Sequence, residues 1–220
     1  MSPVASPYLA EAARDFSRAR EPQQLSTAVV RLHRRVDEIL AASVQGHGVR
    51  TACAAGCGHC CSLLVEVMPA EAFHLASWLR QRLAGSVLDG VVARLRNNVA
   101  VTSGLGSSEA RKHANLACAL LGPDNRCMAY EARPAQCRRC HSTSLAACEE
   151  MYARPEDDTL ESPMHPAVAH NAAVIAAQAR EAQVAQGFDA APRDLNVALL
   201  EALVNPKAWR RWRDGKKAFP

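Results

Sequence analysis

Apolar side chains recur along most of the chain at the spacing of an α-helix. The clearest example spans residues 22–46, where five apolar positions fall at steps of three or four and form one stripe of an amphipathic helix. These positions are Leu25, Val29, Leu32, Val36 and Ile39. A Ser86 cap predicts the start of another helix. Comparable patterns predict helices over residues 7–20, 69–84, 145–152, 166–186, 192–204 and 206–213.

The helical pattern is interrupted in several places. Residues 62–67 predict a short extended piece, and residues 116–130 predict a small β-hairpin around a turn at 122–125. Residues 46–61 are rich in Gly and Cys and have no clear period, which predicts a loop with one helical turn. Residues 104–108 are expected to form a linker. The expected fold class is therefore mainly α.

The length and the order of the elements predict one irregular helical domain over residues 1–220. A chain of 220 residues is long enough to build one well-packed core. Within it we expect an N-terminal helical segment over residues 1–46, a cysteine-rich core over 53–148 and C-terminal helices over 164–220.

The composition excludes global disorder and does not indicate a nucleic-acid partner. Apolar residues make up 49% of the chain and charged residues 22%, which is ordinary for a folded protein. The net charge, 26 − 22 = +4, is too weak to predict nucleic-acid binding by itself. A basic group near the C-terminus is expected to be a solvated helix end, with RNA binding as the less favoured interpretation. It contains Arg210, Arg211, Arg213, Lys216 and Lys217.

Targeting signals are not evident, so we expect a cytoplasmic protein without a membrane partner. The first residues lack a basic stretch followed by an apolar core, and no run of about 18 apolar residues occurs. Disulfides do not persist in a reducing cytosol. The odd number of cysteines and the adjacent pair Cys60–Cys61 also suit a disulfide framework poorly.

Nine cysteines are the unusual feature of the composition, and they fall into two groups. Several thiolates that converge on one point bind a soft metal, and glycines such as Gly56 and Gly58 let a loop wrap closely around it. Adjacent thiols diverge, so Cys60 and Cys61 are expected either to serve two metals or to divide into one ligand and one buried thiol. Six to nine thiolates are enough for two four-coordinate sites or one larger cluster. The candidate ligands are Cys53, Cys57, Cys60 and Cys61 in the first group, and Cys118, Cys127, Cys137, Cys140 and Cys148 in the second.

Simple burial or nucleophilic chemistry would account for fewer of the cysteines. Any single cysteine could be a small buried apolar side chain. A nucleophilic thiol beside His59 or His141 would explain one cysteine only. The spacing of Cys53, Cys57 and Cys60 is also that of radical-SAM clusters, but the flanking helices do not fit the βα units of such enzymes.

The cysteine motifs resemble the YkgJ-type cysteine-cluster family over residues 53–140. The members of this family are described as zinc- or iron-chelating proteins, and Cys148 matches one branch of it, whereas Cys140 is not required by the pattern. The resemblance includes the signature Tyr130-x2-Arg133-Pro134-x2-Cys137-Arg138. We expect Pro134 to fix the turn and Arg133 to bond loop carbonyls or a thiolate.

The resemblance implies a metal-binding protein that holds iron, as an iron–sulfur cluster, or zinc. Its role would be structural, sensing or metal transfer, and a protein partner is left open. Related motifs in a flagellin lysine methylase, where the cysteines are associated with an iron–sulfur cluster, favour iron slightly. Two alternatives remain: an enzyme that uses an iron–sulfur cluster for a redox or modification reaction, and a zinc-stabilised interaction module with weak nucleic-acid binding.

Overall fold

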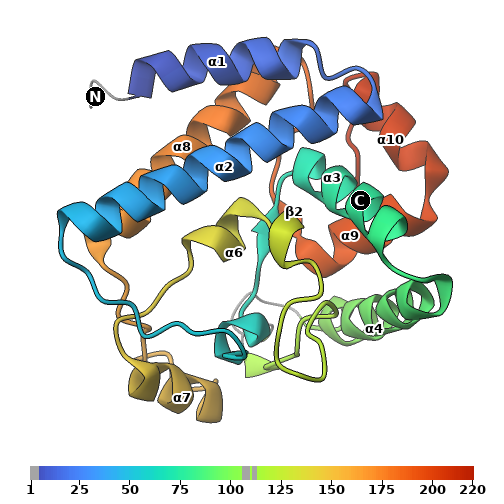
Figure 1. Ribbon diagram of the computed structural model, residues 1–220. Coiled ribbons are helices and arrows are strands. Elements are labelled where there is room, and N and C mark those ends of the chain that lie inside the picture. The colour runs from blue at the N-terminus through green and yellow to red at the C-terminus, as the bar shows by residue number, and fades with distance from the viewer. Residues whose placement is uncertain (1–4, 106–109, 111–112) are drawn as a thin grey trace.

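Three long helices form one side of the molecule (Figure 1). The computed structural model describes residues 5–105, 110 and 113–220. Helix α1 (Ala5–Ser17) folds back on α2 (Pro22–Gly46), and α8 (Pro166–Ala185) packs against both. The first predicted helix ends three residues earlier than expected because the chain already turns at residues 18–20. Within the described ranges, no helix is both long and apolar enough to cross a membrane.

The other helices pack around α9 (Leu195–Val204) on the opposite side. Helix α9 lies against α3 (Pro69–Arg82) and α4 (Gly85–Ser103), and α10 (Pro206–Arg213) follows it directly. Ser86 was expected to cap α4, and this prediction is wrong. The helix begins one residue before Ser86 with Ala84 as its N-cap, so the serine lies inside the first turn.

Aromatic side chains join α10 to the core. Trp212 is fully buried and stacks on Phe188 with ring centroids 4.3 Å apart, and its indole N–H donates to the carbonyl of Asp189 at 2.8 Å. Phe73 of α3 lies 5.8 Å from Trp212, measured between ring centroids. Burial of several aromatic rings in one cluster is a large apolar contribution to stability, so this end of the molecule is firmly packed.

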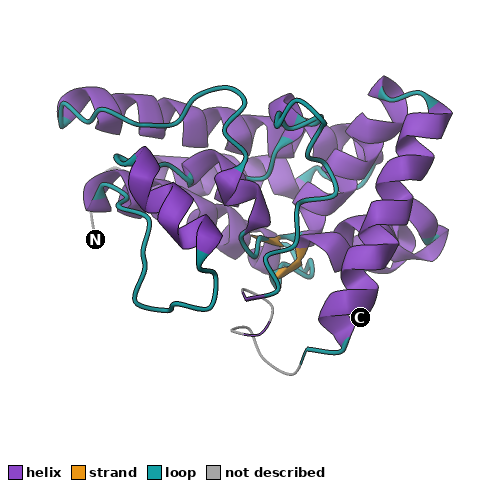
Figure 2. Cartoon of the chain, turned by 90° about the horizontal axis from the view of Figure 1, so that it is seen from below, coloured by secondary structure: helices purple, strands orange, loops and turns teal. Residues whose placement is uncertain are grey.

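The small sheet joins two segments that are far apart in the sequence. Strand β1 (Glu66–Val67) pairs with β2 (Arg193–Asp194) in antiparallel register, and helices and loops surround the pair in the view from below (Figure 2). The helix predicted from residue 192 begins at 195, because the Asp194 side chain accepts hydrogen bonds from the first free N–H groups of α9. The predicted hairpin around residues 122–125 forms one antiparallel bridge, between Leu121 and Cys127.

The remaining elements are short and lie on the cysteine-bearing part of the chain. They are η1 (His59–Ser62), η2 (Tyr130–Ala132), α6 (Ala135–Arg139) and α7 (Leu145–Ala153). The mainly α fold is confirmed, as is the loop with one helical turn that was predicted before residue 62. Part of the linker predicted at 104–108 lies outside the described residues.

Candidate metal centre

The first cysteine group lies on the loop that leaves α2 and ends in η1. Cys53 and Cys60 are exposed, whereas Cys57 and Cys61 are half-buried. The turn between Cys53 and Cys57 needs Gly56, whose φ of +87° is a conformation that residues with a side chain rarely adopt. Glycine at this position therefore lets the loop reverse direction between two candidate ligands, as the sequence predicted.

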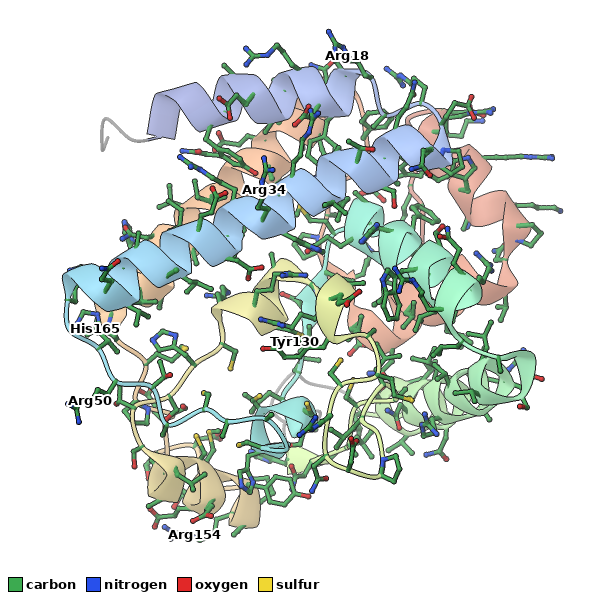
Figure 3. All side chains as sticks on the ribbon, in the orientation of Figure 1. Arg18, Arg34, Arg50, Tyr130, Arg154 and His165 are labelled. Carbon is green, nitrogen blue, oxygen red and sulfur yellow. The ribbon has the colours of Figure 1, made fainter. Side chains whose placement is uncertain are left out.

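The second cysteine group is spread over a bridged turn, α6 and α7. Cys118 and Cys127 lie on either side of the turn, Cys137 is inside α6, Cys140 directly follows α6, and Cys148 is inside α7. All five are half-buried, and all nine cysteines of the protein are free thiols. Figure 3 shows sulfur atoms on the loops between α6 and α7, on the side of the molecule away from α1.

Backbone hydrogen bonds tie the two groups together. The Cys118 N–H donates to the carbonyl of Cys61 at 2.8 Å, and the Ala52 N–H donates to the carbonyl of Ser142 at 2.7 Å. The Ser142 N–H in turn lies 3.4 Å from the Cys53 sulfur. Loops from both groups are therefore in direct contact, although long stretches of helix separate them in the sequence.

The sulfur atoms also interact across the groups. The Cys60 thiol lies within hydrogen-bonding reach of the Cys61 and Cys140 side chains. Cys61 is near enough to Cys118 and Cys127 to interact with them electrostatically. These five cysteines, two from the first group and three from the second, form the centre of the network.

The remaining four cysteines extend this network toward its rim. Cys137 interacts electrostatically with Cys118, Cys127 and Cys60. Cys53 interacts with Cys57, Cys60 and Cys148. The Cys148 sulfur also lies 3.7 Å from the hydroxyl of Ser162. The structure thus brings both predicted groups into one region, with Cys57 and Cys148 at its edge.

The thiols interact with one another but do not surround a single point. Within the part of the chain that the structure describes, no three or more His, Cys, Asp or Glu side chains are arranged so that they could hold a metal ion as they stand. Ligation therefore requires side-chain rotation or a shift of the glycine-bearing loops. The donor set itself, thiols without a carboxylate, fits soft metals such as zinc and iron.

The protonation of the cysteines follows from burial and from hydrogen bonds between them. Burial raises the pKa of Cys118 to about 11 and also raises the pKa of Cys137. Hydrogen bonds from the Cys140 and Cys61 thiols lower the pKa of Cys60, and by donating to it those two thiols keep their own pKa values raised. Metal binding at this centre would therefore release protons from most of its ligands.

Two arginines of the signature organise the loop that follows Cys127. Arg133 donates to the carbonyl of Tyr130 at 3.2 Å and places its guanidinium 3.7 Å from the centroid of the Tyr130 ring, so it bonds a loop carbonyl as predicted. Tyr130 remains exposed beside α6 (Figure 3). Arg138 is buried, and it donates to the carbonyls of Glu131 and Arg133 and pairs with Asp37 of α2.

Two buried residues next to the centre were missed from the sequence. Glu71 of α3 accepts a hydrogen bond from the Ala135 N–H at 2.7 Å, and His33 of α2 lies 3.1 Å from the same carboxylate oxygen. Burial by itself would raise the pKa of Glu71, but the hydrogen bonds from His33, Ala135 and Met68 hold it below its usual range. A carboxylate three residues after the cap Met68 is a capping-box signal that could have pointed to Glu71. Nothing in the pattern singled out His33.

These features define a helical protein with a cysteine centre assembled from two separate segments of the chain, one before α3 and one after α4. Residues 52–159 match the model of the CxxCxxCC family, whose description is "Putative zinc- or iron-chelating domain". The resemblance of the cysteine motifs to a cysteine-cluster family is thus confirmed over these residues. Metal chelation is the activity by which the family is described. No curated protein and no solved structure matches the chain.

Proposed function

We propose that the protein holds iron, as an iron–sulfur cluster, through thiolates of both cysteine groups. The observation that carries this proposal is the contact between the groups: Cys60 lies within hydrogen-bonding reach of Cys140, and Cys118 is bonded to the backbone of Cys61. A soft metal needs several thiolates at one point, and these contacts bring thiols from both loops to the same region.

The number of thiols and the related motifs favour iron over zinc. A single zinc ion takes four ligands, whereas more than four cysteines interact here. Related motifs in a flagellin lysine methylase are associated with an iron–sulfur cluster. Zinc is the second candidate, because the all-cysteine donor set fits it equally well.

The exposure of the first group supports a sensing or transfer role rather than a purely structural one. Structural metal sites are closed, whereas Cys53 and Cys60 are exposed to solvent. A partner protein or a small oxidant can therefore reach these thiols. The proposal places the protein in the cytoplasm, because nine free thiols persist in a reducing compartment.

The test is the metal content of protein purified without oxygen. We expect iron and acid-labile sulfide in stoichiometric amounts, together with a broad absorption band at about 400 nm. Stoichiometric zinc in a colourless protein would instead favour the second candidate, a zinc centre. Protein that contains neither metal, and takes up neither on reconstitution, would overturn the proposal.

Variants show whether both groups contribute. Cys60→Ser and Cys137→Ser remove one thiol from each group and are expected to lower the bound metal and the absorption. Ser62→Ala is a matched control on the same loop, because it removes only a hydroxyl that donates to the carbonyl of His59 at 2.9 Å. Equal metal content in all three variants would contradict a centre shared by the two groups.

A further inference from the structure

The short helix α6 carries Cys137, and a buried carboxylate holds its first residue. The Ala135 N–H donates to Glu71 Oε1 at 2.7 Å, and Cys137 follows two residues later. A helix of five residues has too few internal hydrogen bonds to be stable by itself. The place and direction of α6, and with them the position of the Cys137 sulfur, therefore depend on contacts from outside the helix.

Glu71 is itself held in place by rigid elements. His33 Nε2 lies 3.1 Å from Glu71 Oε1, and the Met68 N–H donates to Glu71 Oε2 at 3.3 Å. The side chains of Glu71 and His33 are each only 4% exposed. Glu71 lies on α3 and His33 on α2, so the carboxylate is fixed between two long helices before it meets α6.

A second contact holds the other end of α6 against α2. Arg138, directly after Cys137, pairs with Asp37, which lies four residues after His33 and hence on the same face of α2. Arg138 also donates to the carbonyls of Glu131 and Arg133. Helix α6 is thereby attached to the helical part of the molecule on both sides of Cys137.

We propose that Glu71, held by His33, is a positioning residue that fixes Cys137 in the cysteine centre and so sets the affinity for the metal. This inference rests on the proposed function, because it assigns a role in the same centre. Preorganised ligands lose less conformational freedom on binding, and partners that orient metal ligands are typically worth about 10- to 100-fold in affinity. The negative charge of Glu71 does not favour a thiolate nearby, so its contribution is geometric rather than electrostatic.

The hydrogen bond between Glu71 and α6 can be removed by a substitution on α6 that changes neither His33 nor Glu71. Ala135→Pro deletes the N–H that Glu71 accepts, and proline suits the first position of a helix. Pro134 has the extended backbone (ψ 160°) that a residue before proline requires. We expect this variant to keep the helical fold and to bind metal about 10- to 100-fold more weakly.

The pair itself can be replaced by apolar side chains. Glu71→Ala alone would leave His33 and the Ala135 N–H unpaired in the core and would destabilise the protein. The double variant His33→Leu/Glu71→Met avoids the unpaired histidine, because replacing both partners of a buried ion pair by packed apolar residues is often neutral for stability. The Ala135 and Met68 N–H groups still lose their acceptor. It is expected to stay folded, with a somewhat lower denaturation midpoint than the parent because of these two N–H groups, and to show the same loss of metal affinity as Ala135→Pro.

The experiment titrates the metal-free full chain with Co²⁺ in competition with a chelator and follows the thiolate-to-cobalt absorption. Glu201→Gln is the matched control, because Glu201 also accepts a hydrogen bond, from Asn205 at 2.8 Å, but lies on α9. We expect weaker binding and a weaker thiolate band, as for a centre with one ligand fewer, in Ala135→Pro and in the double variant only. A purely structural role for Glu71 would leave this band unchanged.

The outcomes separate this inference from the proposed function. If the parent binds Co²⁺ and both variants bind it within about threefold of the parent, the positioning role is overturned and the metal centre stands. If the parent binds no metal at all, both proposals fall. If the double variant does not fold, Ala135→Pro decides, since it changes neither His33 nor Glu71.

Discussion

The helical part of the molecule comprises α1 to α4 and α8 to α10, and its cysteine part comprises residues 53–61 and 118–153. These two parts are stabilised in different ways. In the helical part, side chains such as Trp212, Phe16 and Leu32 are almost fully buried. Helix α7 of the cysteine part has no buried residue, and its contact with η1 includes the Tyr152 and His59 rings at 5.4 Å. The helical part has a core of large side chains that stabilises it directly, whereas the cysteine part adds mostly small side chains, such as Ala129 and Ala132, to that core. It therefore relies more on hydrogen bonds between its loops and on whatever its thiols bind.

Truncation of the aromatic core of the helical part should cause the largest loss in the free energy of unfolding. Trp212→Ala removes a fully buried ring stacked on Phe188 and should lower the free energy of unfolding by about 3–5 kcal/mol. Urea denaturation followed by circular dichroism measures this change. Val30→Ala is the control, since the Val30 side chain is 52% exposed and its loss should cost little. A similar loss in both variants would mean that α10 is not part of the main core.

Acid should weaken the helical part through His74. Burial lowers the pKa of His74 to about 4, so the folded protein keeps this side chain neutral while the unfolded chain takes up a proton below its ordinary pKa of 6.5. The contribution of His74 to the free energy of unfolding is therefore complete above pH 6.5, and about 3 kcal/mol of it is lost as the pH falls toward 4.

The lowered pKa of Glu71 also makes the folded protein less stable in acid, at pH values below 4.5. The measurement is the denaturation midpoint of metal-free protein, followed from neutral pH down to 4.5, the ordinary pKa of a glutamate. This range reports on His74 before Glu71 begins to contribute. His74→Gln, which cannot titrate, should show a flatter profile. An unchanged slope in that variant would assign the acid sensitivity to other groups.

Metal removal should affect the cysteine part alone. A metal present at about 100 times its dissociation constant stabilises the state that binds it by about 2.7 kcal/mol. After chelation, amide hydrogen exchange should accelerate in residues 53–61 and 118–153 and stay unchanged in α2, α3 and α9. Uniform acceleration across the chain would show that the two parts unfold as one cooperative unit.

A single methyl group in the first cysteine loop should have the smallest effect. Gly56→Ala places a side chain where φ is +87° and should cost about 1 kcal/mol. Because the candidate ligands Cys53 and Cys57 lie on either side of Gly56, weaker metal binding should accompany this loss of stability. Gly85→Ala is the control, since a Cβ there meets nothing within 4 Å and φ is not positive. Identical metal affinities in the two variants would mean that the loop tolerates the change by moving.

Local signals predicted most of the fold. Proline at the start of α2, α3, α8 and α10, together with the apolar spacing, placed these helices to within one or two residues. The Ser86 cap was wrong because residues 84–86 offer several adjacent starting points, and packing of α4 selects among them. The strands 66–67 and 193–194 could not be paired from sequence, since each is two residues long and its partner lies far along the chain.

The sequence by itself determined which residues are chemically able to bind a metal and which short elements carry them. Residue type and spacing are local properties, and they identified both cysteine groups and the signature around Arg133 and Cys137. The tertiary structure alone decided that Cys60 meets Cys140 and that Glu71 and His33 hold the start of α6. These contacts arise from the packing of α2 and α3 against α6, and packing depends on many distant side chains at once rather than on any motif.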